Sequence, residues 1–187
     1  MFLITGCGRS GTTYITRVLQ HCGLDVEHER LGRDGTVSGF YCFDAPWYSN
    51  KQLAPRPKFD VILHQARHPL RTIASLQTGR SWNWACRFLP VGVGAPLLTR
   101  CCYNWLVFNE EAERQSALTY RIEALERAWP EIQRLLGFAY SYKRAVAGVS
   151  RKTNARKHSA VTWADVREFA PLIYDDIREA AVRYGYE

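Results

Sequence analysis

Short apolar runs alternate along the chain with stretches in which apolar residues recur every three or four positions. The runs predict buried β-strands, and the stretches predict amphipathic α-helices that cover them. The predicted strands are residues 2–5, 24–26, 60–65 and 118–122. The predicted helices are residues 12–22, 69–78, 96–115, 129–136 and 162–184. This alternation is typical of an α/β fold, and we expect a single domain over residues 1–187, with a parallel sheet flanked by helices.

Three segments break the pattern. Residues 31–58 are rich in Gly, Pro and aromatic side chains, and we expect a long loop with one short helix there. A loop of that length in a compact domain is usually functional. Residues 81–95 are irregular and aromatic, and residues 139–158 are basic and loop-like. The aromatic side chains of these loops either stack on a bound ring or pack over the sheet, and the sequence leaves both readings open.

Composition narrows the class of partner. The 187 residues carry 25 Lys and Arg against 18 Asp and Glu, a formal net charge of +7, which favours an anionic partner. The six cysteines form no C-x-x-C pair or zinc-finger spacing, so we expect reduced thiols, a cytoplasmic location and no metal. No apolar run is long enough for a membrane span, and no RNA-binding motif is present, so nucleic acid is not an expected partner.

A glycine-rich loop joins the first predicted strand to the first predicted helix. Residues 6–13 read Gly-Cys-Gly-Arg-Ser-Gly-Thr-Thr. In this setting, backbone N–H groups and the positive end of the helix cradle a phosphate. The spacing is close to that of a Walker A loop, but Thr12 stands where the Walker lysine would be, and the cation Arg9 lies inside the loop. A kinase of this type would lack the lysine that contacts the β- and γ-phosphates.

This loop resembles the 5′-phosphosulfate loop of the sulfotransferases that use 3′-phosphoadenosine-5′-phosphosulfate (PAPS). The resemblance implies a P-loop-like sulfotransferase fold in which Arg9 contacts the sulfonate group being transferred. The cofactor-binding residues that it implies are Gly8, Arg9, Ser10, Gly11, Thr12 and Thr13.

A second element follows the predicted strand 60–65. It carries Arg67, Pro69 and Ser75, and it resembles the 3′-phosphate element of the same family. An arginine offers a planar pair of donors to a phosphate dianion. By the same resemblance, the basic loop at 150–158 places Arg151 and Lys152 near the cofactor, although this loop is not glycine-rich as in the family. Whether that loop contacts cofactor, acceptor or only solvent stays open.

Sulfonate transfer to a hydroxyl requires a general base. Glu29 follows the predicted strand 24–26, and its place resembles that of the glutamate base of some family members. His28 is the second candidate, and Asp44 in the aromatic loop is a weaker one. His64 lies on a predicted strand, where a core histidine is more common than a catalyst.

The resemblance therefore predicts an enzyme that moves a sulfonate group from PAPS to a hydroxyl or amine acceptor without a metal. The acceptor, whether glycan, lipid or small molecule, and the oligomeric state stay undetermined. The alternatives are a P-loop nucleotide or small-molecule kinase and a non-catalytic nucleotide-binding protein.

Overall fold

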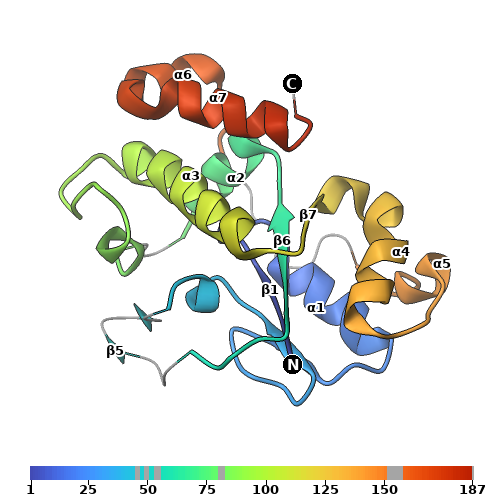
Figure 1. Ribbon diagram of the computed structural model, residues 1–187. Coiled ribbons are helices and arrows are strands. Elements are labelled where there is room, and N and C mark those ends of the chain that lie inside the picture. Colours follow the sequence, from blue (N-terminus) through green and yellow to red (C-terminus); the bar gives the residue numbers. More distant parts are fainter. Residues whose placement is uncertain (45–46, 49–50, 53–55, 80–82, 151–157, 187) are drawn as a thin grey trace.

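The computed structural model describes residues 1–44, 47–48, 51–52, 56–79, 83–150 and 158–186. These residues form an α/β fold with a five-stranded sheet, all of whose strand pairs are parallel, and helices on both faces (Figure 1). The predicted fold class is confirmed.

The sheet consists of β1 (Phe2–Thr5), β2 (Val26–His28), β3 (Gly35–Val37), β6 (Val61–Ala66) and β7 (Leu118–Arg121). Two further strands, β4 (Trp47–Tyr48) and β5 (Lys51–Gln52), pair with each other in antiparallel fashion. The helices are α1 (Thr12–His21), α2 (Pro69–Leu76), α3 (Leu97–Gln115), α4 (Leu125–Leu136), α5 (Tyr142–Ala145), α6 (Trp163–Phe169) and α7 (Tyr174–Arg183). Short 3₁₀ turns occupy Phe40–Cys42, Ala85–Arg87, Ile122–Ala124 and Pro171–Ile173.

The strand order β2-β3-β1-β6-β7 puts β1 in the middle of the sheet. From β1 the chain first builds the β2–β3 side and then crosses to β6 and β7 on the other side. The direction of growth thus reverses next to β1. In open parallel sheets, ligands bind outside the carboxyl ends of the strands at such a reversal.

Two apolar cores lie on opposite faces of the sheet. One is built around α3, which packs against α2, α6, α7 and β6, and it contains the fully buried Trp105 and Phe108. The other lies under α1 and α4, and Ile15, Leu63 and Trp129 are among its buried residues. Figure 1 shows α2 and α3 on one side of β6 and α1, α4 and α5 on the other, with α7 across the top of the view.

The most consequential departure from the predicted elements is β3, which lies inside the predicted loop 31–58. It has only three residues, too few to show a period of two. Its first residue, Gly35, packs so closely on β1 that a Cβ there would lie 2.5 Å from the carbonyl oxygen of Phe2. The second strand also lies later than predicted, at Val26–His28, so that His28 ends a strand.

The helices depart from the prediction in three places. The expected helix 162–184 is divided into α6 and α7, because Ala170 before Pro171 adopts a non-helical conformation (φ −139°, ψ 53°). Its predicted start is confirmed, since Thr162 and Asp165 form a capping box. Helix α4 begins at Leu125, four positions before the predicted start, and α5 lies in a segment predicted as loop.

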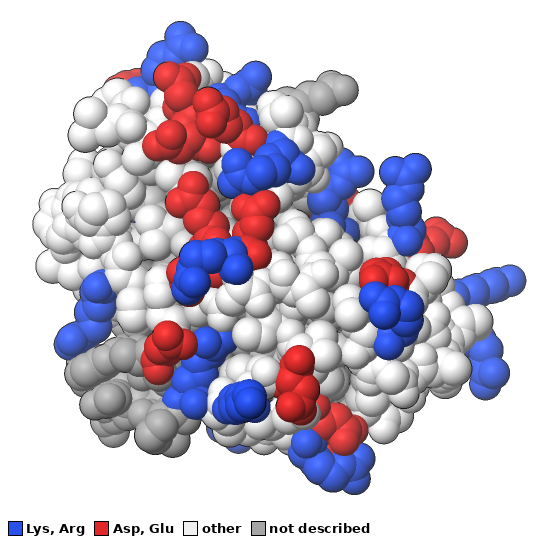
Figure 2. Space-filling view, in the orientation of Figure 1, with Lys and Arg blue, Asp and Glu red and all other residues white. Residues whose placement is uncertain are grey.

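On the face shown in Figure 2, Lys and Arg side chains lie interspersed with Asp and Glu. The net positive charge is thus not gathered into one patch on that face. Within the part of the chain that the structure describes, no helix is both long and apolar enough to cross a membrane.

Candidate active site

The segments that carry the predicted site residues meet at the carboxyl edge of the sheet. The glycine loop follows β1, Glu29 follows β2, Ser38 follows β3 and Arg67 follows β6. The parallel strands bring these ends together on both sides of the reversal point. The fold therefore gathers residues that lie far apart in the sequence.

The glycine loop leaves β1 in a conformation that glycine permits. Gly6 has φ +150°, and a Cβ there would lie 2.5 Å from the carbonyl oxygen of Gln65 on β6. Gly11 has φ +95° and precedes the first residue of α1. Arg9 between them also has a positive φ, of 68°, which is uncommon for a residue with a side chain. Among the described residues no side chain caps α1, and the Tyr14 N–H donates to the Gly11 carbonyl at 3.0 Å, so the N–H groups of Thr12 and Thr13 are left for another acceptor.

Three hydroxyl groups lie in the loop and at the start of α1, on Ser10, Thr12 and Thr13. Ser10 Oγ is buried and has no hydrogen-bond partner within the described part of the chain. The Ser10 carbonyl accepts a hydrogen bond from Gln65 Nε2 at 2.9 Å, which fixes the loop against β6. Thr12 Oγ1 lies 2.9 Å and Thr13 Oγ1 3.4 Å from His28 Nε2. A buried hydroxyl without a partner beside an uncapped helix end fits a phosphate group.

The second predicted anchor contacts the glycine loop directly. Arg67 Nη1 donates to the carbonyl oxygen of Arg9 at 2.8 Å, and Arg9 Nε donates to Ser75 Oγ at 3.0 Å. The indole N–H of Trp105 donates to the Arg67 carbonyl at 3.2 Å and holds the end of β6. Burial lowers the pKa of Arg67, which nevertheless stays cationic near neutral pH. The two predicted elements thus contact each other directly.

Glu29 is held by residues that follow β3. Its backbone is left-handed, with φ 58°, and its side chain is 24% exposed. Ser38 Oγ donates to Glu29 Oε2 at 2.5 Å, and the Gly39 N–H donates to Oε1 at 3.4 Å. Burial raises the pKa of Glu29 to about 7, although these hydrogen bonds act in the opposite direction. A carboxylate with that pKa is suited to accept a proton near neutral pH.

His28 lies between Glu29 and the glycine loop. Its Nε2 atom is 3.8 Å from Glu29 Oε1 and also faces the hydroxyl of Thr12. Burial lowers the pKa of His28, which keeps the ring neutral at pH 7. The imidazole therefore forms its hydrogen bond with the loop side, at Thr12, while the Glu29 carboxylate lies beyond hydrogen-bond distance.

Ser38 was missed by the sequence analysis. It orients Glu29, and its own Oγ accepts from the Phe40 N–H at 3.1 Å, while its N–H donates to Ile4 on β1. The only signal that could have found it is its place directly after β3, and that strand was not predicted.

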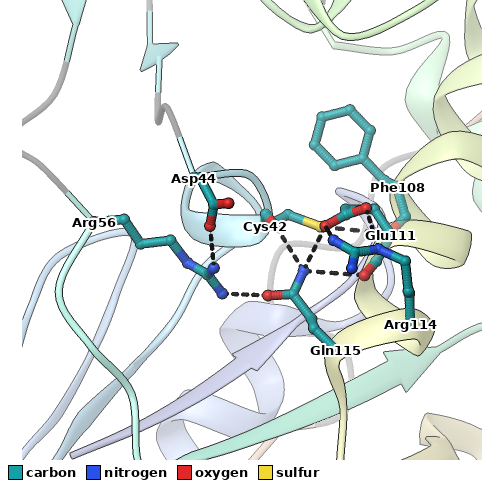
Figure 3. A network of polar contacts seen from close by, with 7 residues as sticks. All are labelled: Cys42, Asp44, Arg56, Phe108, Glu111, Arg114 and Gln115. Carbon is teal, nitrogen blue, oxygen red and sulfur yellow. Dashed lines mark hydrogen bonds and ion pairs between the residues drawn. The ribbon is translucent and has the colours of Figure 1, made fainter.

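Asp44, the weaker base candidate, and His64, expected to be a core histidine, both lie away from Glu29. Asp44 is 92% exposed and pairs with Arg56, whose guanidinium also contacts Gln115 at the end of α3 (Figure 3). Gln115 in turn donates to the Cys42 carbonyl, so this network attaches the loop after β3 to α3. His64 is fully buried on β6, and burial lowers its pKa to about 4. Neither arrangement brings these side chains to Glu29 or Arg9.

Arg151 and Lys152 lie outside the described residues. The aromatic residues around the described loops pack on one another: the rings of Phe43 and Phe88 stack at 4.2 Å, and Phe40 meets Trp84 edge-on at 4.9 Å. They extend the core built on α3. Of the two roles that the sequence left open for these aromatic side chains, the structure shows packing.

All six cysteines are thiols in the structure. In the described part of the chain, no group of three His, Cys, Asp or Glu side chains is arranged to hold a metal ion.

Comparison with known proteins gives little beyond this geometry. No family model matches the chain, and no curated protein matches it in sequence. One similar solved structure is that of the mouse sulfotransferase SULT7A1 complexed with PAP, at 12% identity and a TM-score of 0.40. The match covers 91% of this chain and 66% of the mouse chain.

Proposed function

We propose that this chain binds PAPS and transfers its sulfonate group to a hydroxyl or amine of an acceptor. The observation that carries the proposal is the contact between its two predicted phosphate anchors. Arg67 bonds to the main chain of Arg9, and the Arg9 side chain bonds to Ser75. A nucleotide that carries phosphates at both its 3′ and 5′ positions would be bound by two such anchors, one for each phosphate.

The residues present fit such a ligand. The unpartnered hydroxyl of Ser10, the uncapped start of α1 and the hydroxyls of Thr12 and Thr13 suit a 5′-phosphate. Arg67 and Ser75 suit the 3′-phosphate, as the resemblance implies. Gly8 contributes backbone to the same loop, and Arg151 and Lys152 stay proposed contacts of the cofactor.

When bound, PAPS supplies an activated sulfonate group whose leaving group is adenosine 3′,5′-bisphosphate. The chain's own part is positioning and proton transfer. Glu29, held by Ser38, accepts the proton of the acceptor group, and its raised pKa keeps that proton transfer favourable near pH 7. His28 lies beside the carboxylate, and Arg9 stabilises the negative charge that develops as the acceptor attacks in line. No step requires a metal ion.

Calorimetric titration tests the nucleotide. The proposal predicts that adenosine 3′,5′-bisphosphate binds in the presence of EDTA, and more tightly than ATP with Mg²⁺. A preference for Mg·ATP would contradict it and favour a kinase. Binding of any phosphate compound without selectivity for adenosine would favour a non-catalytic role.

Sulfonate transfer from radiolabelled PAPS to a panel of phenols, glycans and lipid alcohols tests the base. We expect Glu29→Gln to lower the rate by about 100-fold or more, the usual contribution of a general base. Glu27→Gln is the matched control, because Glu27 lies two positions earlier on β2 and is exposed. An equal loss in both variants, or in neither, would remove Glu29 from the base role.

A further inference from the structure

Two buried asparagines of α3 lie directly beneath the glycine loop. Asn104 and Asn109 are each 1% exposed and stand on a helix whose other buried residues are mostly apolar. Asn109 Oδ1 accepts a hydrogen bond from the backbone N–H of Cys7 at 3.2 Å. Asn104 Oδ1 accepts one from the Cys7 thiol, also at 3.2 Å. Both side chains therefore act on one loop residue, which lies between Gly6 and Gly8 and two positions before Arg9.

His64 completes the arrangement. Its Nε2 atom lies 3.0 Å from Asn109 Oδ1, and its Nδ1 atom lies 3.2 Å from Thr119 Oγ1. Because Asn109 Oδ1 is an acceptor, the proton of the neutral ring must be on Nε2, and Nδ1 then accepts from the threonine hydroxyl. A continuous series of hydrogen bonds thus runs from β7 through β6 and α3 to the glycine loop.

The amide nitrogens show that these asparagines are not placed for packing. Nδ2 of Asn104 and Nδ2 of Asn109 are buried and have no hydrogen-bond partner in the described part of the chain. Burying such groups unpaired is costly, and leucine would fill a helix position in a core without that cost. What each asparagine gains is the contact of its oxygen with Cys7.

We propose that Asn109, oriented by His64, is a positioning residue that fixes the backbone of the glycine loop in its binding conformation. The inference rests on the proposed function only for the identity of the ligand that the loop binds. Asn104 has the same effect through the Cys7 side chain. Neither asparagine contacts the nucleotide in this account.

Asn109→Leu tests the proposal, because leucine has a similar volume and no acceptor. In the ligand-free chain, we expect the Cys7 amide to exchange its hydrogen at least about tenfold faster by NMR, while core amides of β6 keep their protection. The affinity for adenosine 3′,5′-bisphosphate should fall about tenfold, as for one lost buried hydrogen bond. Asn109→Asp, which keeps the acceptor, should restore protection of the Cys7 amide.

A double-mutant cycle with Cys7→Ala separates the two asparagines. That substitution removes the thiol and keeps the N–H, so Asn104→Leu should have no further effect on affinity in its background, whereas Asn109→Leu should keep its full effect. The proposal is overturned if Asn109→Leu leaves Cys7 exchange unchanged, or if it speeds exchange equally throughout the core.

Two further outcomes remain decisive. If Asn109→Leu does not fold, His64→Phe must produce the same local loss of Cys7 protection, since it removes the partner of Asn109 without touching it, and intact protection would overturn the proposal. If the wild-type chain binds no bisphosphate, the proposed function fails, and the exchange of the Cys7 amide still decides the role of Asn109.

Discussion

Glu29 should make the protein less stable at neutral pH than it would be without this carboxylate. Its pKa rises from 4.5 to about 7 on folding, because burial opposes the charged form. Below pH 4.5 the carboxyl is protonated in both the folded and unfolded states. Between pH 4.5 and 7 the unfolded chain ionises and the folded chain does not, so stability falls as pH rises. At about 1.4 kcal/mol per pKa unit, the accumulated cost above pH 7 is about 3 kcal/mol.

Glu29→Gln removes this cost. Glutamine keeps the shape of the side chain and an oxygen for Ser38, and any change in hydrogen bonding that it causes is independent of pH. The free energy of unfolding of the variant minus that of the wild type should therefore grow by about 3 kcal/mol between pH 4.5 and pH 8. Urea denaturation followed by circular dichroism across this range measures the difference.

The matched control is again Glu27→Gln, for which the difference should be flat. A flat difference for Glu29→Gln as well would mean that Glu29 is not desolvated on folding and that its pKa is not raised. If the difference in free energy of unfolding grows with pH and the variant also loses transfer activity, Glu29 serves function at the expense of stability.

Three other outcomes are expected. Gly6→Ala should destabilise the chain by at least about 2 kcal/mol in urea denaturation, because its Cβ would meet the Gln65 carbonyl at 2.5 Å, and a smaller loss would mean that the loop relaxes easily. Ser10→Ala should raise the free energy of unfolding by about 1 kcal/mol, because the hydroxyl that it removes is buried without a partner in the described part of the chain. The same change should weaken bisphosphate binding about tenfold. Lower stability with unchanged binding would contradict the proposed contact between Ser10 and the 5′-phosphate. As pH falls from 6.5 to 4, the free energy of unfolding of the wild type should fall by about 3 kcal/mol more than that of His64→Gln, because His64 stays neutral in the folded chain while it is protonated in the unfolded chain. An equal fall in both proteins would contradict the lowered pKa of His64.

Much of this architecture could be predicted from the sequence, because its signals are local. The β1–loop–α1 unit follows from an apolar run, a glycine cluster and helical spacing, and β6 with the start of α2 follows from a similar run and Pro69. The proximity of Arg9 to Arg67 then follows from topology, since parallel strands end at one edge.

The remainder depends on tertiary contacts that leave no local pattern. Strand β3 is three residues long and is defined by its neighbours β2 and β1, so its prediction failed and Ser38 was missed with it. The buried Asn109 on α3 reads in sequence as an ordinary polar residue of a helix, and only its contact with Cys7 gives it a role. The raised pKa of Glu29 likewise arises from burial in the folded chain, which no local sequence pattern reveals.

The central claim is that Arg67 recognises a 3′-phosphate beside the glycine loop. The most direct test is calorimetric titration of the wild type and of Arg67→Ala with adenosine 3′,5′-bisphosphate and with adenosine 5′-monophosphate, which lacks the 3′-phosphate. Arg71→Ala, at an exposed position on α2, is the control for loss of charge. We predict that the wild type and the control prefer the bisphosphate by about tenfold or more, and that Arg67→Ala loses this preference while still binding the monophosphate. The same preference in Arg67→Ala as in the wild type, or none in either, would contradict the account.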